Sequence, residues 1–395
     1  MKYTAKSPKP PQHFIHFAQP LFGREEKAEV SKALDSGWVT LGPRVKQFED
    51  NVANYVGAKY AVGLNSCTAA LHLAYIVAGV KAGDEVITTP FTFIATINPL
   101  LHIGAKPIFA DIDEQTLNLD PKSVEAKITK KTKAIIVMDY GGNPVDFAAF
   151  KKISKKYNIP LIDDAACALG AEYKGKKVGS LADISCFSFH PIKSISTGDG
   201  GMITTNNRQM AERATLLRLQ GMSRDAWKRY TATGSWLYDV VEPGYKYNMS
   251  DIQAAIGICQ LKKLDGFLKT REKYVAMYDR AFGKIEEITT PYVAPNTRHA
   301  RNIYTLRFDF KKLKITRDWL VDELKKRQIG VSVYYIPPYM FPYYKKHLKI
   351  KPSDVPVTHR VFESMLSLPL SPKMTQKDVT YIIDVVTYLI ESNRA

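Results

Sequence analysis

Short apolar runs alternate with segments of helical periodicity over residues 60–205, and this alternation constrains the fold more than any other feature. Strands that alternate with helices predict an α/β fold whose mostly parallel central sheet is covered on both faces. Such sheets bind ligands in the crevice beyond the carboxyl ends of their strands. The expected strands are 61–64, 85–88, 107–110, 134–138, 160–162, 184–189 and 201–205, and the expected helical segments between them include 68–77, 94–102 and 147–156.

The pattern changes after residue 250, where long helical segments dominate. The expected elements there are helical segments 251–264 and 267–282, strand 304–308, helix 317–327, strand 329–335 and helix 376–390. A chain of 395 residues is too long for one small core. We therefore expect an N-terminal arm over residues 1–16, a large α/β domain over 17–260 and a smaller C-terminal α+β domain over 261–395.

Several classes of protein are disfavoured by composition. No apolar run approaches the length of about 18 residues that crosses a bilayer, and the basic, proline-rich start lacks the apolar core of a secretory signal. We therefore expect a cytoplasmic protein without membrane insertion. The four cysteines form no C-x-x-C pair, so we expect neither a metal site nor a disulfide framework; they are Cys67, Cys167, Cys186 and Cys259.

The chain carries a formal net charge of +17. Such an excess attracts anions and speeds their encounter with the protein. The lysines are scattered in short runs such as 130–133 and 151–156, and no nucleic-acid-binding module is recognisable. The charge therefore favours phosphorylated small molecules over nucleic acid.

Two polar segments stand next to expected strands in the first half. Asn65-Ser66-Cys67-Thr68 follows a strand and opens a helix, whose free N–H groups and dipole favour a phosphate group. The same residues serve equally well as a plain helix cap. Asp163 and Asp164 end another strand, where a carboxylate can pair with the cation of a ring nitrogen, cap a turn or bind a metal.

A lysine and a glycine-rich turn follow the next expected strand. Desolvation in a crevice would lower the pKa of Lys193 and make its neutral amine available to a carbonyl. The ordinary alternative is one surface lysine among many. The turn over residues 196–201 lets the backbone pass close to a ligand, or forms a simple hairpin connection.

In order and spacing these segments resemble the DegT-type nucleotide-sugar aminotransferases, pyridoxal phosphate (PLP) enzymes of fold type I. The likeness runs from about residue 17 to the C-terminus. It is most specific at S-F-H-P-I-K (188–193), with D-A-A (164–166) upstream and G-G (200–201) downstream. Y-K-Y-N (245–248) is similar to the same segment in family members that make 4-amino-4-deoxyarabinose for lipid A. Further matching text lies at 36–43, 84–88, 244–255 and 367–370.

The resemblance implies a role for each cofactor-site residue. Lys193 holds PLP as a Schiff base and acts as general acid and base, and Asp164 pairs with the pyridine nitrogen. Phe93 and Ala166 lie on the two faces of the cofactor ring, although simple core packing of Phe93 is the alternative. Cys67 is a further cofactor-binding residue. The phosphate contacts are Ser66, Thr68 and Ser188, and Asn248 reaches the phosphate from a neighbouring subunit. A homodimer with shared active sites is therefore expected.

The chain also departs from the family pattern. Cys167 stands near the cofactor's phenolic oxygen, where relatives often carry histidine or glutamine, and a thiol is a poorer hydrogen-bond partner. Gln220 replaces a frequent histidine, and the segment 334–339 lacks histidines that are common in the substrate loop. The residues expected at the substrate rim are Trp38, Thr40, His190 and Tyr335, and His190 serves equally well as a structural residue.

The activity implied by the resemblance moves an amino group from an amino acid, expected to be L-glutamate, to a nucleotide-linked keto sugar. A 4-keto-6-deoxy or related sugar is expected, for cell-surface glycan or lipopolysaccharide synthesis. One alternative is a sugar dehydratase of the same family, but those enzymes carry histidine at the position of Lys193. A PLP-binding regulator would append a DNA-binding module, and a Rossmann oxidoreductase would carry G-x-G-x-x-G after the first strand; neither feature is found.

Overall fold

The computed structural model describes residues 8–222 and 238–395. A seven-stranded sheet forms the centre, with the order β1-β9-β8-β5-β4-β2-β3. The strand β9 is antiparallel to both of its neighbours, whereas the pairs from β8 to β3 are all parallel. The prediction of a mostly parallel α/β sheet is therefore confirmed. The strands are β1 (Tyr60–Leu64), β2 (Glu85–Thr88), β3 (Lys106–Phe109), β4 (Thr132–Met138), β5 (Leu161–Asp164), β8 (Ile184–Ser188) and β9 (Gly201–Thr205).

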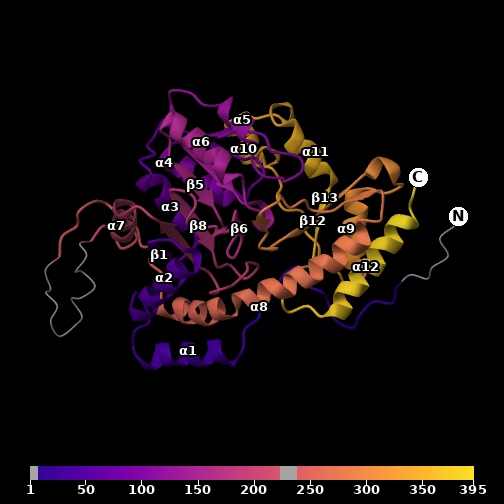
Figure 1. Cartoon of the computed structure of the whole chain (residues 1–395), viewed down its shortest axis with the longest axis horizontal. Helices are drawn as coiled ribbons and strands as arrows, with labels where there is room; N and C mark the ends of the chain where they lie inside the picture. Colours follow the sequence, from indigo (N-terminus) through magenta and orange to yellow (C-terminus); the bar gives the residue numbers. More distant parts are fainter. Residues whose placement is uncertain (1–7, 223–237) are drawn as a thin grey trace.

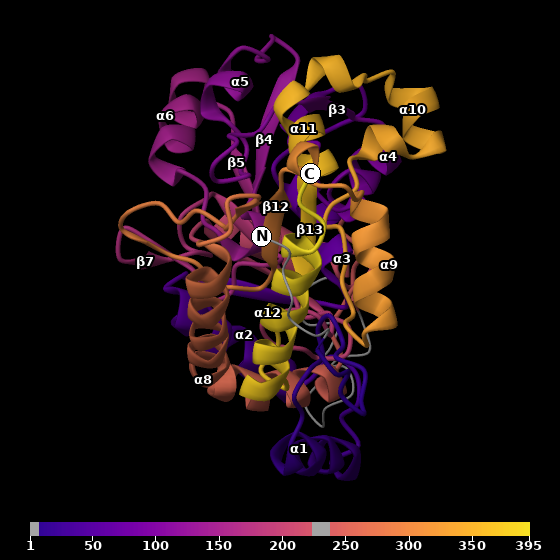
Figure 2. The same ribbon diagram turned by 90° about the vertical axis from the view of Figure 1, so that its right-hand side faces the viewer.

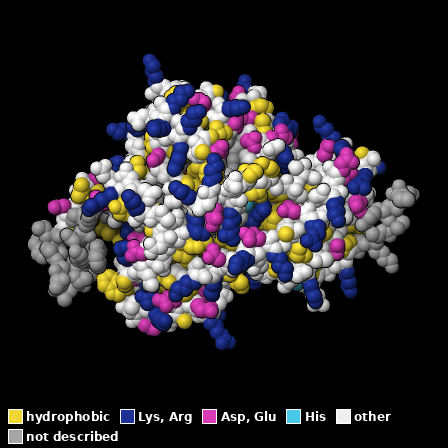
Figure 3. Space-filling view, in the orientation of Figure 1, with side chains coloured by type: hydrophobic (Ala, Val, Ile, Leu, Met, Phe, Trp, Pro, Cys, Tyr) yellow, Lys and Arg dark blue, Asp and Glu magenta, His cyan; other side chains and the backbone are white. Residues whose placement is uncertain are grey.

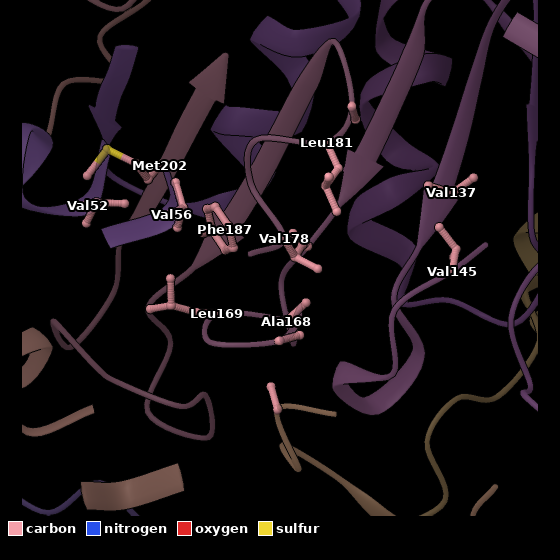
Figure 4. Packing of buried hydrophobic residues seen from close by; sticks show 14 of the residues in the cluster. Val52, Val56, Val137, Val145, Ala168, Leu169, Val178, Leu181, Phe187 and Met202 are labelled. Carbon is pink, nitrogen blue, oxygen red and sulfur yellow. The ribbon is translucent and has the colours of Figure 1, made fainter. Parts of the chain in front are cut away.

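Helices cover both faces of this sheet (Figure 1). One face packs against α3 (Cys67–Val77), α4 (Asn98–Ile103) and α7 (Arg208–Leu217). The other packs against α2 (Pro43–Val56), α6 (Phe147–Tyr157) and the first half of α8. Part of the core on this second face is visible in Figure 4, where Val52 and Val56 lie near Phe187 and Met202. The short helix α5 (Pro121–Glu125) precedes β4.

The longest element is α8 (Asp251–Phe282), a single helix of 32 residues. It begins with a capping box, because the Ser250 hydroxyl accepts from the Gln253 amide and the Gln253 side chain accepts from the Ser250 amide. Its first half reaches Leu268 in the core under the sheet, and its last turns, from Tyr274 onward, belong to a second core. The helix α1 (Arg24–Asp35) lies along its outer side (Figures 1 and 2).

The second core lies under a three-stranded antiparallel sheet with the order β10-β12-β13. Helices α9 and α12 cover it together with the end of α8. The elements of the chain after α8 are β10 (Ile288–Thr289), β12 (Tyr304–Phe308), α9 (Arg317–Lys326), α10 (Pro342–Leu348), α11 (Pro356–Ser364), β13 (Met365–Leu368) and α12 (Gln376–Glu391), and α10 and α11 pack outside this core. A third small sheet joins the hairpin β6 (Glu172–Tyr173) and β7 (Lys176–Lys177) to β11 (Thr297–Arg298).

The predicted strand over residues 329–335 is wrong. Within the described chain this segment makes only two isolated bridges, Ile329 with Ile15 and Ser332 with Ser367. Its alternating apolar residues do pack on the second core, which explains the period-two pattern. Because the segment changes its partner after two residues, no continuous ladder can form. The bridge to Ile15 also brings this residue into the second core.

Among residues 8–222 and 238–395, no helix combines the length and the apolar character needed to cross a membrane. Lysine and arginine side chains are spread over the face seen in Figure 3 and do not gather in one patch.

Candidate active site

The carboxyl ends of neighbouring strands bring the main candidate residues to one edge of the sheet. Asp164 is the last residue of β5, Ser188 is the last residue of β8, and these two strands are parallel neighbours. Helix α3 begins directly after β1, and the segment that carries Phe93 follows β2. This is the crevice in which doubly covered parallel sheets bind their ligands.

Asp164 is a buried carboxylate held by two donors. Its Oδ2 accepts a hydrogen bond of 2.7 Å from the Thr96 hydroxyl, and its Oδ1 accepts from the amide of Ala166 at 3.2 Å. Thr96 Oγ1 lies 2.7 Å from Thr92 Oγ1. Burial raises the pKa of Asp164, while the Thr96 bond and the charge of Lys193 act against that rise. Neither threonine is marked by a sequence pattern, because a turn after a strand tolerates many polar residues.

Lys193 points into the same crevice. Its Nζ lies 3.2 Å from Cys167 Sγ, and its backbone amide donates to the carbonyl of His190 at 2.9 Å. Burial alone would lower the pKa of Lys193. The contact with Cys167, followed by the nearness of Cys67 and Asp164, outweighs burial, so the pKa of Lys193 lies above its usual value. The prediction of a lowered pKa for this lysine is therefore wrong for the protein without cofactor.

The loop that carries Lys193 is held in place by side chains from α8 and from the segment before β12. The Asn302 side chain donates to the carbonyl of Ile192 at 3.1 Å. The buried Arg271 of α8 donates to the carbonyl of Leu370 at 2.8 Å and reaches the carbonyl of Lys193 at 3.5 Å. Burial lowers the pKa of Arg271 to about 10. The sequence gives no sign of these contacts, since they join residues far apart along the chain.

The start of α3 has the features expected of a phosphate site and those of a plain cap. The Ser66 hydroxyl accepts from the Ala69 amide at 3.1 Å, as an N-cap does. Thr68 is exposed and Cys67 is half-buried, with Cys67 Sγ 3.9 Å from the Cys186 carbonyl. Burial, followed by the charge of Asp164, raises the pKa of Cys67 well above its usual value. Ser188 is buried, and its hydroxyl accepts from the His190 amide at 3.4 Å.

The glycine-rich turn approaches protein backbone. A Cβ atom on Gly201 would lie 2.3 Å from the Ser66 carbonyl oxygen and 2.6 Å from the Cys67 amide. Only glycine therefore lets β9 start beside the turn that opens α3. The turn itself connects the antiparallel neighbours β8 and β9, as in a hairpin.

Aromatic residues line another wall of the crevice. Phe93 is 53% exposed, so it is not a core residue, and its ring centroid lies 6.3 Å from that of Tyr335. Tyr335 is buried, with its hydroxyl 3.5 Å from Cys167 Sγ. The Tyr140 hydroxyl donates to the carbonyl of Tyr334 at 2.6 Å. Ala166 is half-buried beside Cys167.

The remaining candidates lie outside this cluster. Asn248 bridges Leu64 at the edge of β1, and its side chain donates to Thr40 Oγ1 at 3.4 Å. Thr40 is exposed and Trp38 is half-buried. In the described part of the chain, no hydrogen bond or ring contact joins these three residues to Lys193.

Two more positions singled out in the sequence are exposed. Partial desolvation of the His190 ring, followed by the charge of Lys193, lowers the pKa of His190. Gln220 adopts a φ of 61°. No group of three or more His, Cys, Asp or Glu side chains suited to a metal ion occurs in 8–222 and 238–395.

The side chains of this crevice have the chemistry needed to hold PLP. Lys193 offers an amine for the aldehyde, and Asp164 offers a buried carboxylate for the ring nitrogen. Phe93 offers an exposed aromatic face for a flat ring. The start of α3 and the Thr68 hydroxyl offer donors for the phosphate.

Comparison with known proteins gives a consistent result. Residues 20–387 match the DegT/DnrJ/EryC1/StrS aminotransferase family. The spore coat polysaccharide biosynthesis protein SpsC of Bacillus subtilis is 44% identical over 380 residues, covering 96% of this chain and 98% of SpsC.

Two solved structures have nearly the same fold. The putative sugar aminotransferase Spr1654 from Streptococcus pneumoniae, in its PMP form, has a TM-score of 0.88 at 33% identity, covering 95% of this chain and 98% of that one. Helicobacter pylori PseC, an aminotransferase involved in the biosynthesis of pseudoaminic acid, has a TM-score of 0.90 at 31% identity. It covers 96% of this chain and 100% of its own.

Proposed function

Since the chain belongs to the DegT/DnrJ/EryC1/StrS aminotransferase family and is a PLP-dependent sugar aminotransferase, we propose that its acceptor is a nucleotide-linked keto sugar. One observation carries the assignment of its site: the amine of Lys193 and the buried carboxylate of Asp164 belong to one cluster around Cys167, at the carboxyl ends of the parallel strands.

Each of these two residues has a separate task. When bound, PLP supplies an aldehyde that bonds to amines and a cationic ring that withdraws electrons. The Nζ of Lys193 would hold the aldehyde and would move the proton at the α-carbon of the amino donor. The carboxylate of Asp164 would keep the proton on the ring nitrogen. Phe93 would orient the flat ring, and the start of α3 would bind the phosphate.

Several observations support a nucleotide-linked sugar. The net charge of +17 attracts a substrate that carries a diphosphate. SpsC is named for spore coat polysaccharide biosynthesis, and PseC acts in the biosynthesis of pseudoaminic acid. We take a 4-keto-6-deoxy or related sugar as the acceptor, L-glutamate as the donor and a cell-surface glycan or lipopolysaccharide as the destination.

A homodimer with shared active sites is part of the proposal. Asn248 and Thr40 lie at the β1 edge of the sheet, and within the described residues neither makes a hydrogen bond to Lys193 of its own chain. Val240 and Val241, on the stretch that leads to Asn248, are 62% and 66% exposed. Such neighbouring apolar side chains are suited to burial against a second copy. We place the enzyme in the cytoplasm, where nucleotide-linked sugars are made.

The test is an amino-transfer assay with nitrogen-15 glutamate and a panel of UDP-, dTDP- and GDP-linked keto sugars, read by mass spectrometry. We expect one class of acceptor to gain a labelled amino group. The Lys193→Ala variant should transfer at least about 10²-fold more slowly, because it lacks the group that moves the proton. If no keto sugar gains the label while the protein binds PLP, the proposed acceptor is wrong.

A further inference from the structure

We propose that Asp139 and Asp163 share a proton, and that this carboxyl pair positions Asp164 and Tyr140 at the active site. The pair lies in the core behind the crevice and takes no part in the chemistry described above. Both residues are fully buried, with a relative exposure of 0%.

The pair lies on the face of the sheet opposite to the one that Asp164 faces. Successive residues of a strand point to opposite faces, so Asp163 faces away from the side that Asp164 faces. Asp163 Oδ2 accepts from the Ser185 hydroxyl of β8 at 2.9 Å. Asp139 follows β4, and its Oδ1 accepts from the amide of Val145 at 2.8 Å.

Each carboxyl group has a second oxygen that finds no donor. Asp139 Oδ2 and Asp163 Oδ1 are buried and make no hydrogen bond to a donor in the described part of the chain. The pairing of β4 with β5 sets Val137 beside Asp163, so Asp139, two residues after Val137, follows on the same face as Asp163, and each carboxyl group acts on the pKa of the other. Two ionised carboxylates only accept hydrogen bonds and repel each other. The contact becomes favourable when a proton lies between them.

No cation neutralises the pair. In residues 8–222 and 238–395, neither carboxyl group forms an ion pair with lysine, arginine or histidine. The charged neighbour that affects both members of the pair is Asp164, on the same strand as Asp163. Burial is the largest cause, and it raises the pKa of Asp139 to about 8 and that of Asp163 well above its usual value.

A neutral histidine lies near the same turn. A Cβ on Gly141 would lie 3.9 Å from His299 Cε1. Burial, followed by the charge of Arg301, lowers the pKa of His299 well below its usual value, so it brings no positive charge. The proton therefore remains as the way to relieve the repulsion between Asp139 and Asp163.

Hydrogen bonds of the pair hold two parts of the crevice in place. The amide of Asp139 donates to the carbonyl of Asp164 at 3.4 Å. The bond from Val145 closes the turn that carries Tyr140, which in turn holds the carbonyl of Tyr334. Asp139 and Asp163 are thus positioning residues. The shared proton does not depend on the proposed function, because it is present in the chain without cofactor. Only the role given to Asp164 and Tyr140 rests on that function.

Infrared spectroscopy of the cofactor-free chain tests the proton directly. A protonated carboxylic acid has a carbonyl band that an ionised carboxylate lacks. We expect this band near neutral pH in the wild type, its loss in the Asp139→Asn/Asp163→Asn double variant, and its retention in Asp35→Asn, which changes an exposed residue of α1. A wild-type protein without the band, or a double variant that keeps it, would overturn the proposal.

The pH dependence of stability gives a second test, which does not need the band. The folded protein holds this proton at pH values at which the unfolded chain has already lost it. The free energy of unfolding should therefore fall as pH rises between the ordinary aspartate pKa of 3.8 and the folded value of about 8. Each such proton changes the unfolding equilibrium about tenfold per pH unit. The double asparagine variant should lose this slope, and an unchanged slope would contradict us.

Cofactor affinity separates positioning from simple packing. In Asp163→Asn, the amide can donate to Asp139 and still accept from Ser185, so PLP affinity should stay within about twofold of the wild type between pH 6 and 9. Asp163→Ala loses both bonds, and its affinity should fall about tenfold or more. Equal losses in the two variants would refute the positioning role. Failure to aminate any keto sugar would leave all three results intact and reject only the proposed function.

Discussion

The Nζ of Lys193 lies 3.2 Å from the Sγ of Cys167, and this contact sets the resting state of the candidate active site. The pKa of the lysine lies above its usual value, so the amine is protonated near neutral pH in the protein without cofactor. Tyr335 contacts the same sulfur through its hydroxyl at 3.5 Å. The lysine must therefore lose a proton and its sulfur contact before it can bond to an aldehyde.

Replacement of Cys167 by alanine should lower the pKa of Lys193, because the contact with the sulfur raises it. The neutral amine then becomes available at lower pH, and the pH at which PLP capture is half-maximal should fall by roughly one unit, a tenfold gain in rate at fixed pH. The measurement is the rate of borohydride-fixed PLP incorporation across pH 6 to 10. Cys259→Ala is the control, because Cys259 lies on α8 and contacts the Glu25 carbonyl. A profile that stays unchanged in Cys167→Ala would remove the sulfur from this role.

The strands and helices of the large sheet could be predicted, because the apolar periodicity of each segment matches the burial of its side chains there. The strand β2 and the helix α6 were placed from apolar periodicity to within one residue at each end. The same reasoning failed for residues 329–335, where alternating apolar side chains are buried without a continuous partner strand. The boundary expected at 260/261 stays a prediction, and a helix with no local break crosses it.

The candidate site was predictable to a different degree for different residues. Lys193 and Asp164 were identified by motif, and the fold brings both to the same crevice. Thr96, Arg271 and Asn302 were missed, since they act through contacts between distant segments that leave no local pattern. The direction of the Lys193 pKa was also missed, because it depends on which atoms lie next to the amine.

Thr96→Val should weaken PLP binding. The variant keeps the shape of the side chain but removes the 2.7 Å hydrogen bond to Asp164, and the pKa of that carboxyl should rise further. A partly protonated Asp164 pairs less well with a ring cation, and the dissociation constant should increase roughly tenfold, about 1.4 kcal/mol. Equilibrium titration at pH 7 measures this.

Thr88→Val provides a matched control for Thr96→Val. Thr88 is also a fully buried threonine, but its hydroxyl makes no hydrogen bond in the described residues. Its replacement should leave PLP affinity unchanged. Equal weakening in both variants would show that general packing, rather than the bond to Asp164, determines the affinity.

Arg218→Met should destabilise the protein strongly. The buried guanidinium forms an ion pair with Glu49 and donates to the carbonyl of Gly63 at 2.8 Å, next to the turn that opens α3. Its loss leaves the Glu49 carboxylate buried without a counter-ion, which costs about 3–5 kcal/mol. Denaturant unfolding of the cofactor-free protein is the measurement. The exposed pair Lys46 and Asp50 offers the control, because Lys46→Met should change stability by less than about 1 kcal/mol. Similar small losses in both variants would contradict the role given to the buried pair.

Mixing two inactive variants should restore activity if Asn248 serves the neighbouring subunit. In a heterodimer of Lys193→Ala and Asn248→Ala chains, one site loses both groups, while the other combines an intact Lys193 with the intact Asn248 of its partner. About half of the chains in a random mixture form heterodimers, so roughly a quarter of the wild-type sites become complete. Amino-transfer rates after co-refolding measure this, with each homodimer as its own control. If Asn248 acts within its own chain, for example only through its hydrogen bond to Thr40, every site in the mixture remains defective. No activity should then return.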